Sequence, residues 1–265
     1  MSGSSNPIKT QCPLTILILF SGQTPLLDPF LEALQGLEKP AGTELAAIDN
    51  SGSEVFHQTL LKHGLSPIRF NPQLPTVSSS PYSRESQIRK AEHCARLYSF
   101  SKEFLKGRDV LILEHDVLPP ANGLIRLQET RHKKNADLVS GTVISRITSQ
   151  FLAWRIKNGS LEDWPMHVWV SRNPKRVMAT GFGFLLLENR IFQQIPFEAK
   201  RASLPYWGCD LNAGVWAYER NLRWFVDGRV RCKHIGSDLQ PARIGNFENV
   251  KAGEFLTFKK VPQPS

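Results

Sequence analysis

The chain has 265 residues, and its 33 Lys and Arg against 24 Asp and Glu give a formal charge of +9 with neutral histidines. Hydrophobic residues make up 41% of the chain and charged residues 22%. These fractions exclude a disordered, collagen-like or coiled-coil protein and indicate a globular chain with a packed core. The four scattered cysteines form no C-x-x-C pair, which argues against a disulfide framework and predicts reduced thiols in a cytoplasm.

The two ends of the chain carry no pattern typical of a packed element. Residues 1–13 are rich in serine and lack the pattern of a secretory signal, and the apolar run that follows, Leu14–Phe20, is far shorter than the roughly 20 residues of a membrane span. We therefore expect no transmembrane segment, a flexible N-terminal tail at 1–13 and a C-terminal tail at 239–265.

The first half of the chain has the pattern of an α/β fold. Apolar runs at 14–20 and 43–49 flank an amphipathic stretch, which predicts a β-α-β unit and hence a mostly parallel sheet. Residues 66–83 hold four prolines and five serines, so they predict an irregular loop that either connects elements or orders over a ligand. The other expected elements are a helix at 53–63, a strand at 68–70, a helix at 84–106 that ends at Gly107, and a strand at 109–113.

The second half has a different composition, because all six tryptophans lie between Trp154 and Trp224. We interpret the chain as one domain, 14–238, with a nucleotide-sugar-binding half at 14–120 and an acceptor-side half at 121–238. The expected elements of the second half are a helix at 124–134, a strand at 137–144, a strand at 183–187, a helix at 210–219, and a pair of strands at 223–226 and 230–234.

The segment DVLILEHDVLPP places three polar residues where a buried strand ends. Side chains alternate along a strand, so Glu114 and Asp116 share one face and His115 points away. Two carboxylates at the carboxyl end of a strand in an open α/β sheet can hold a hard divalent cation. The alternative is a solvated strand end that happens to be acidic, and both interpretations remain open.

Three other positions carry a chemical and a structural interpretation side by side. Asp210 precedes a predicted helix, where it can cap the helix or act as a general base. Gly181 and Gly183 either let the backbone approach a bound sugar or form a β-bulge. His234 is either a metal ligand or a polar residue that ends an edge strand.

Four segments, read in order, resemble the nucleotide-sugar-dependent glycosyltransferases of the GT-A type, near the large family 2. They are LTILILFSGQ, AIDNSGSE, LILEHDV and YWGCDLNAGVWAYERNLRWFVDGRVRCKHIG, and the resemblance covers Leu14 to Gly236. It implies a single GT-A domain, which is Rossmann-like, with a mostly parallel sheet flanked by helices and a small antiparallel acceptor-side part. The implied reaction moves a sugar from a nucleotide-diphosphate sugar, UDP-linked, to an acceptor hydroxyl with inversion.

The resemblance also assigns roles to single residues. It places Asp116 and His234 on a metal ion, Mn²⁺ or Mg²⁺, and it makes Asp210 the catalytic base. A mixed nitrogen and oxygen donor set suits Mn²⁺ somewhat better than Mg²⁺. The residues that it places against the nucleotide sugar are Ser21, Asp49 on the nucleobase, Arg89, Glu114 on the ribose or a water, His115 and Gly181. The chain departs from the family at Glu114, where an aspartate is usual, and at Cys209, where a glutamate often precedes the aspartate.

The acceptor is inferred from basic residues that are interleaved with aromatic ones at 220–233 and clustered at 84–108. This pattern favours a nucleic acid, and we expect hydroxymethylpyrimidine DNA, as in bacteriophage enzymes that modify DNA in the host cytoplasm. The tryptophans available to stack on a flipped base are Trp154, Trp164, Trp169 and Trp207.

Other acceptors and other activities stay open. A lipid-linked or lipopolysaccharide glycan is the alternative acceptor, and a non-catalytic nucleic-acid-binding module is the alternative to an enzyme. A nucleotidyltransferase could use the same carboxylates, but the sequence has no G-x-x-x-x-G-K-S/T loop, which argues against P-loop chemistry.

Overall fold

The computed structural model describes residues 12–71, 84–144, 151–157, 160–163, 173–199 and 208–236. Three sheets lie within these ranges. The strands of the main sheet are β1 (Leu14–Phe20), β2 (Glu44–Asp49), β3 (Ile68–Arg69), β4 (Asp109–Glu114), β6 (Leu138–Thr142), β9 (Lys175–Val177), β11 (Phe184–Glu188) and β12 (Trp224–Arg231). The strands of the two small sheets are β7 (Ala153–Lys157), β8 (Ser160–Asp163) and β10 (Ala179–Thr180), and β5 (Val117–Leu118) with β13 (Lys233–His234).

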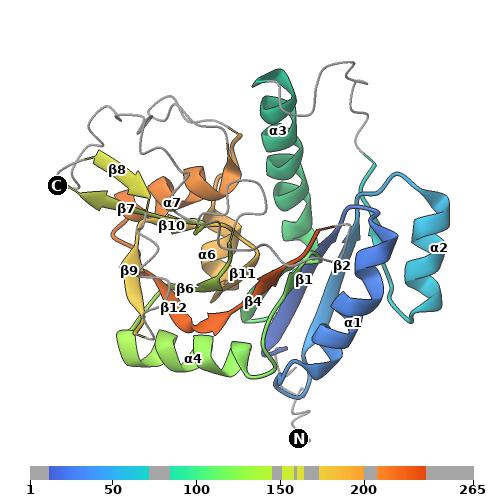
Figure 1. Cartoon of the computed structure of the whole chain (residues 1–265), viewed down its shortest axis with the longest axis horizontal. Helices are drawn as coiled ribbons and strands as arrows, with labels where there is room; N and C mark the ends of the chain where they lie inside the picture. Colours follow the sequence, from blue (N-terminus) through green and yellow to red (C-terminus); the bar gives the residue numbers. More distant parts are fainter. Residues whose placement is uncertain are drawn as a thin grey trace, which may run out of the picture.

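Helices flank the main sheet, as Figure 1 shows. The α-helices are α1 (Leu27–Gly36), α2 (Glu54–Lys62), α3 (Arg84–Ser101), α4 (Gly123–Lys134), α6 (Asn189–Gln194) and α7 (Cys209–Glu219). Short 3₁₀ turns at Thr24–Leu26 and Lys102–Phe104 precede α1 and follow α3.

The main sheet has the strand order β3-β2-β1-β4-β11-β6-β12-β9. Its pairs are parallel except where β11 lies between β4 and β6 and where β9 pairs with β12 at the edge. This mixed, mostly parallel sheet between helices confirms the predicted α/β class.

The core has two layers because β1 is buried on both faces. All seven residues of β1 are buried, and they alternate between the layers. Leu17 and Leu19 pack in the layer that holds α3, α6 and α7. Ile16 and Ile18 pack in the layer that holds α1, α2 and α4. A continuous apolar strand is the pattern expected for a sheet that is covered on both sides.

The parallel strands β1, β2, β4, β6 and β12 end at one edge of the sheet, which we call the carboxyl edge. The register pairs Phe20 with Asp49 and Leu19 with Glu114, so three predicted site strands end side by side. In open α/β sheets ligands bind at this edge. The fold therefore gathers the segments that the sequence singled out, although they lie far apart along the chain.

Several sequence-based boundaries were wrong. The predicted strand pair at 223–226 and 230–234 is one strand, β12, with an irregularity after Val226, followed by the two-residue β13. The helix predicted to reach residue 106 ends at Ser101, where the chain tightens into a 3₁₀ turn. The sequence analysis missed β5, β7 to β10 and α6, because elements of two to six residues carry too few residues to show a period.

Other predictions were confirmed or lie outside the described residues. All four cysteines are free thiols. No helix in the described ranges is both long and apolar enough to span a membrane. The C-terminal tail, residues 72–83 of the predicted loop and all but two residues of the N-terminal tail fall outside the described residues.

Candidate active site at the carboxyl edge of the sheet

Glu114 and His115, at the end of β4, point to opposite faces of the sheet. Glu114 faces the α3 layer, where the hydroxyl of Tyr98 donates a hydrogen bond to its Oε1 at 3.2 Å. His115 is buried on the other side, with its Nδ1 3.0 Å from the carbonyl oxygen of Leu19 and its Nε2 3.3 Å from Ser21 Oγ. The predicted alternation is therefore present. His115 ties the turn after β1 to the end of β4 and is separated from the carboxylates.

Asp116 lies next to His234, which confirms that the fold brings these two residues together. Their Oδ2 and Nε2 atoms are 3.3 Å apart, and the two-stranded β5–β13 sheet holds them in place because Val117 pairs with His234. A backbone hydrogen bond from Ile235 N–H to the Asp116 carbonyl, 2.8 Å, closes this pairing. Both side chains are largely buried, with 14% and 12% exposed.

The hydrogen bond of His234 Nδ1 determines which ring nitrogen of His234 carries the proton. Its Nδ1 lies 2.8 Å from the carbonyl oxygen of Ile144. A carbonyl can only accept, so Nδ1 carries a proton and, in a neutral ring, Nε2 presents a lone pair to the Asp116 carboxylate. Two acceptors then face each other. A proton on Nε2 or a cation that both atoms share satisfies this arrangement, and a backbone carbonyl on the distal nitrogen is the usual support of a metal-binding histidine.

Asp210 occupies the first turn of α7, one residue inside the helix. The helix begins at Cys209 with Gly208 as its N-cap, so the interpretation of Asp210 as the N-cap was wrong. Its Oδ1 accepts a hydrogen bond from the Leu211 amide at 2.8 Å. Burial nevertheless raises the pKa of the Asp210 carboxyl, and the amide hydrogen bonds from Leu211 and Asp210 itself offset only part of this shift. A carboxylate with a raised pKa is a stronger base than one that caps a helix.

A glycine-containing turn passes between the carboxylates. A Cβ added at Gly181 would lie 3.9 Å from Asp210 Oδ2, and one added at Gly183 would lie 3.6 Å from Glu114 Oε2 and 2.9 Å from Val117 Cγ2. The amide of Glu114 also donates to the Gly183 carbonyl at 3.1 Å. Glycine is thus required at 183 by close packing, and the turn brings Gly181 next to Asp210.

The electrostatics of Glu114 show that the acidic residues share one site. Burial is the largest cause that raises the pKa of Glu114 to about 7; the negative charges of Asp116 and Asp210 also raise it, and His234 and the hydrogen bond from Tyr98 lower it. The carboxylates of Glu114, Asp116 and Asp210 are therefore near enough for their charges to affect one another. We call Glu114, Asp116, Asp210 and His234 the acidic cluster.

Asp49 and Ser21 lie at the same edge, at the ends of β2 and β1. Asp49 is 3% exposed; its Oδ1 accepts from the Ser51 amide at 2.9 Å, and its Oδ2 is 2.8 Å from His57 Nδ1. The turns after β1 and β2 touch, because a Cβ at Gly22 would lie 2.7 Å from Ser51 Cβ. Each carboxylate oxygen has two acceptor sites, so Asp49 keeps acceptor capacity beside these contacts.

Arg89 lies on α3, nearer than Tyr98 to the N-terminus of that helix. It is half-buried on α3, nine residues before Tyr98, and a helix rises 1.5 Å per residue, so about 13 Å along the axis separate Arg89 from the residue that contacts Glu114. Its part in the nucleotide site stays a prediction.

Sequence reasoning missed Tyr98 and His57. Both lie on helices within otherwise ordinary amphipathic patterns, and their partners, Glu114 and Asp49, are 16 and 8 residues away. No spacing rule joins a helix side chain to the end of a strand, so only the packed structure identifies them.

The described residues contain no group of three or more His, Cys, Asp or Glu side chains arranged to hold a metal ion. Asp116 and His234 fit a cation as a two-residue donor set. They would need further oxygen donors from a ligand, which is how proteins often bind Mg²⁺ beside a substrate's phosphates.

Among the described residues proposed for a DNA acceptor, one tryptophan and two arginines make contacts within the protein. Trp154 packs from β7 against the α3 and α7 layer, and Trp164, Trp169 and Trp207 lie outside the described residues. Arg220 stacks on Trp216, 4.8 Å from the ring centre, and Arg229 pairs with Asp227. Arg220 and Arg229 of the basic stretch at 220–233 thus make contacts within the protein, while Arg231 and Lys233 lie on the surface.

The sequence matches no protein-family profile, and no curated protein is similar to it. Among solved structures, S. aureus TarS 1-349 aligns with a TM-score of 0.50 and 11% identity, over 83% of this chain and 59% of that one. TarS 1-349 in complex with UDP-GlcNAc aligns with a TM-score of 0.49 and 11% identity, over 83% and 57%. A197 from STIV aligns with a TM-score of 0.44 and 13% identity, over 91% and 100%.

The chain therefore spans less than two thirds of the TarS fragment. At these identities the similarity concerns the fold, which is of the GT-A type: a large mixed sheet between helices with small antiparallel sheets beside it.

Proposed function

We propose that this chain is a glycosyltransferase that moves a sugar from a nucleotide-diphosphate sugar, UDP-linked, to an acceptor hydroxyl. One observation carries the proposal. The carboxyl edge of a GT-A-type sheet carries the Asp116–His234 pair, and the turn that holds Gly181 and Gly183 passes Asp210 and Glu114 at the same edge. The turns that hold Ser21 and Asp49 end at the same edge.

Asp116 and His234 are the residues that would hold a divalent cation, Mn²⁺ or Mg²⁺. The mixed oxygen and nitrogen pair suits Mn²⁺ better than Mg²⁺. When bound, such a cation would stabilise the negative charge that develops on the diphosphate leaving group. The Ile144 carbonyl fixes the tautomer of His234, so its Nε2 needs no rearrangement before it binds.

The donor nucleotide would lie across the ends of β1 and β2. Asp49 would accept a hydrogen bond from the nucleobase, and His57 holds its carboxylate in place. His115 holds Ser21 in the same way. Because both supports are largely buried, the proposed contacts are oriented before the ligand arrives, which lowers the entropy cost of binding.

Asp210 would act as the base. As the acceptor oxygen attacks the anomeric carbon, its proton passes to the Asp210 carboxylate, the bond from the anomeric carbon to the phosphate oxygen breaks, and the nucleoside diphosphate leaves with the electron pair. A single displacement of this kind inverts the anomeric carbon. The raised pKa of Asp210 strengthens it as a base, and activity falls as the pH drops through that pKa.

The proposed acceptor follows from the sequence. The sequence favours a hydroxymethylpyrimidine in DNA, with a lipid-linked or lipopolysaccharide glycan as the alternative. Of the basic and aromatic residues that suggested DNA, Trp154, Arg220 and Arg229 make contacts within the protein, and Arg231 and Lys233 are exposed. Acceptors of both kinds therefore belong in the first assay.

The test is a transfer assay with Mn²⁺, a panel of UDP-sugars, and acceptors that include 5-hydroxymethylpyrimidine DNA and glycans, followed by mass spectrometry of the products. We expect a sugar-sized mass increase on one acceptor. Asp210→Asn should lower transfer by about 10²- to 10⁴-fold, the usual contribution of a general base. Asp28→Asn is the matched control, since that carboxylate is 86% exposed on α1.

Two outcomes would overturn the proposal. Full activity in Asp210→Asn and Asp116→Ala would remove the site assignment. No turnover with any donor, together with salt-dependent DNA binding that both variants retain, would identify a binding module instead.

A further inference from the structure

The strand β12 carries a large bulge where it faces α4. Val226 pairs with Ser140 and Arg231 with Thr142, so five steps of β12 span two steps of β6. The additional residues, which include Gly228, leave the ladder and move toward the first half of α4. Bulges of this kind re-aim side chains and are frequent beside functional sites.

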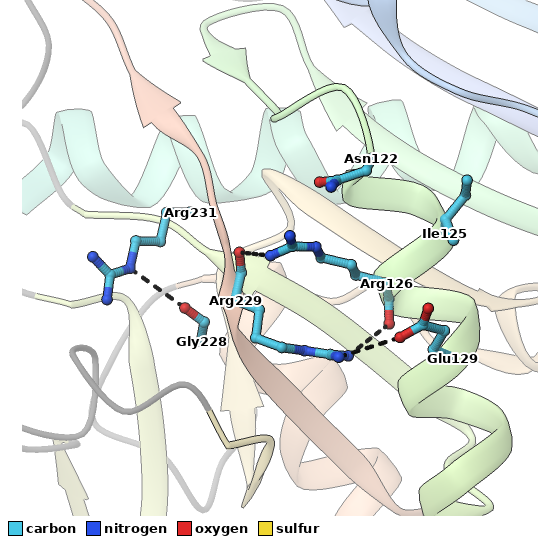
Figure 2. A pocket seen from close by; sticks show the side chains of 7 residues that line it. All are labelled: Asn122, Ile125, Arg126, Glu129, Gly228, Arg229 and Arg231. Atoms are coloured by element: carbon cyan, nitrogen blue, oxygen red, sulfur yellow. Dashed lines mark hydrogen bonds and ion pairs between the residues drawn. The ribbon is translucent and has the colours of Figure 1, made fainter.

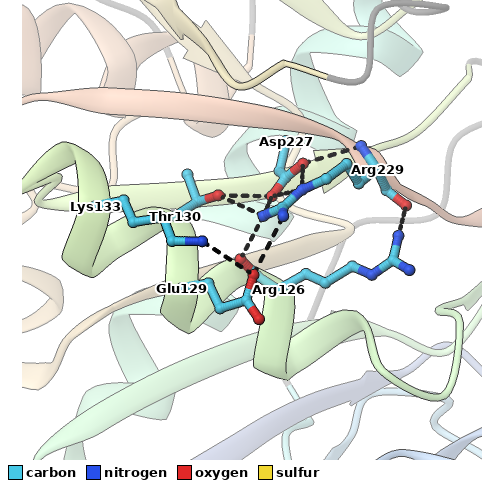
Figure 3. Close-up of polar contacts among 6 residues, drawn as sticks. All are labelled: Arg126, Glu129, Thr130, Lys133, Asp227 and Arg229. Carbon is cyan, nitrogen blue, oxygen red and sulfur yellow. Dashed lines mark hydrogen bonds and ion pairs between the residues drawn. The ribbon is translucent and has the colours of Figure 1, made fainter.

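A buried carboxylate holds the bulge in shape, as Figure 3 shows. Asp227 is fully buried. Its Oδ1 accepts hydrogen bonds from the amide and Nε of Arg229 at 2.9 and 3.0 Å, and its Oδ2 accepts from Thr130 Oγ1 at 2.7 Å. Glu129 Oε2 lies 3.2 Å from Arg229 Nη1. The charge of Arg229 is thus paired with carboxylates of the protein, and these contacts hold the shape of the bulge.

A hollow of about 660 Å³ opens between the bulge and α4. Figure 2 shows its lining from both elements: Asn122, Ile125, Arg126 and Glu129 from α4 and the turn before it, and Gly228, Arg229 and Arg231 from β12. Three arginines against one glutamate give the lining a net charge of +2 (3 − 1), and Asp227 behind it reduces this to +1. A volume of this size suits a small ligand.

Arg126 differs from Arg229, whose guanidinium pairs with Asp227 and Glu129. Its Nη1 donates to the carbonyl oxygen of Arg229 at 3.0 Å, and Arg229 Nη2 donates back to the Arg126 carbonyl at 3.5 Å. Within the described residues no carboxylate pairs with the guanidinium of Arg126. By contrast, Arg131, on the same helix, pairs with the buried Asp109 at 3.0 Å. Arg126 is therefore held in place with most of its donors left for a ligand.

The start of α4 adds donors beside Arg126. The helix begins after Asn122, whose side chain makes no capping hydrogen bond. The Gly123 amide donates to the Pro120 carbonyl at 2.8 Å, and the amides of Leu124 and Ile125 have no carbonyl partner within the helix. A guanidinium fork matches the oxygens of a phosphate, and a phosphate near a helix N-terminus also gains from the helix dipole.

We propose that the hollow between α4 and the β12 bulge binds a phosphate ester, with Arg126 as its principal donor. The site is distinct from the acidic cluster, and its existence does not depend on the proposed transferase activity. Two sources share this chemistry: a phosphate group carried by the acceptor, and a small phosphorylated molecule that acts as an effector.

The first experiment measures binding without turnover. Inorganic phosphate and glycerol 3-phosphate are titrated into the metal-free, donor-free full chain, with ³¹P NMR line broadening as the readout. We expect Arg126→Gln to weaken binding at least tenfold, because a charged hydrogen-bonding partner is lost. The phosphate affinity of Arg126→Lys should lie between those of the natural protein and Arg126→Gln, since lysine keeps the positive charge but lacks the planar fork of donors.

The matched control is Lys134→Gln, which removes one exposed positive charge from the same helix about 12 Å away. It should bind phosphate like the natural protein, and the thermal midpoint of each variant shows that it is folded. Equal phosphate affinity in Arg126→Gln and the natural protein would overturn the proposal. So would the absence of any phosphate binding to the natural protein at a phosphate concentration on the order of 10 mM, which is enough to detect a weak ligand.

Turnover then separates the two sources. If the acceptor supplies the phosphate, Arg126→Gln raises KM for a phosphorylated acceptor and leaves kcat and donor hydrolysis unchanged. If an effector supplies it, added glycerol 3-phosphate changes the rate with an uncharged acceptor, and Arg126→Gln abolishes that response. Failure to find any transferase activity would refute the proposed function and leave the binding result standing.

Discussion

Two polar regions of this protein manage buried charge in opposite ways. In the acidic cluster, Glu114 and Asp210 are carboxylates whose pKa values burial raises, and for Glu114 the neighbouring acids raise it further. In the β12 bulge, burial also disfavours the charge of Asp227, but hydrogen bonds from Arg229 and Thr130 lower its pKa overall. Because its charges are paired, the β12 bulge serves to stabilise the fold. The first keeps unfavourable charge, which is typical of sites that bind cations or move protons.

The largest expected effect comes from breaking the paired region. Asp227→Asn leaves the largely buried Arg229 without its main partner, and breaking a buried ion pair costs about 3 to 5 kcal/mol in the free energy of unfolding. Urea denaturation measures the loss. Asp28→Asn, an exposed carboxylate, should change the free energy of unfolding by less than about 0.5 kcal/mol. Equal stability of the two variants would contradict a structural role for Asp227.

The acidic cluster should respond to pH in the opposite sense. The pKa of Glu114 rises from its ordinary value of 4.5 to about 7 in the folded protein, so the folded state holds the proton more tightly than the unfolded state. Stability from this group is complete below pH 4.5 and is lost as the pH rises toward 7. The loss is at most about 3 kcal/mol.

Denaturation curves of the metal-free protein and of Glu114→Gln, collected from pH 4 to 8 in EDTA, isolate this contribution. The difference in free energy of unfolding between the two proteins should change across that window. Parallel pH profiles would show that Glu114 is ionised like an exposed carboxylate.

The smallest effect should come from the hydroxyl of Tyr98. Its hydrogen bond lowers the pKa of Glu114, so Tyr98→Phe should raise that pKa and move the pH-dependent loss of stability to higher pH. The lost hydrogen bond itself is worth about 1 kcal/mol. Tyr218→Phe, on the half-buried side of α7, is the control, and a pH profile identical for both variants would remove the assigned role of Tyr98.

Much of the fold was predictable because its strongest elements carry local patterns. The strand at Leu14–Phe20 was predicted to the residue, since seven consecutive apolar side chains suit a strand buried on both faces. The helix at Glu54–Lys62 was bounded by Ser53, whose side chain accepts a hydrogen bond from the Phe56 amide. Such signals depend on neighbours in sequence, so no tertiary information is needed to read them.

The candidate site was likewise predictable only in part. The sequence alone determined that Glu114, Asp116, Asp210 and His234 are the residues worth examining, because each stands where a strand or helix begins or ends. It could not show that His234 faces Asp116, 118 residues away, or that Tyr98 holds Glu114. Those contacts depend on strand order and register.

Only the tertiary structure decided the balance of charge. The arginines at 220–233 form one basic run in the sequence, yet folding pairs Arg229 with Asp227, stacks Arg220 on Trp216 and leaves Arg126 of a distant helix without a carboxylate among the described residues. The physical reason is that the effective charge of a side chain depends on its solvent exposure and on partners brought close in space. Composition fixes how many charges the chain carries, and packing fixes which of them remain to meet a ligand.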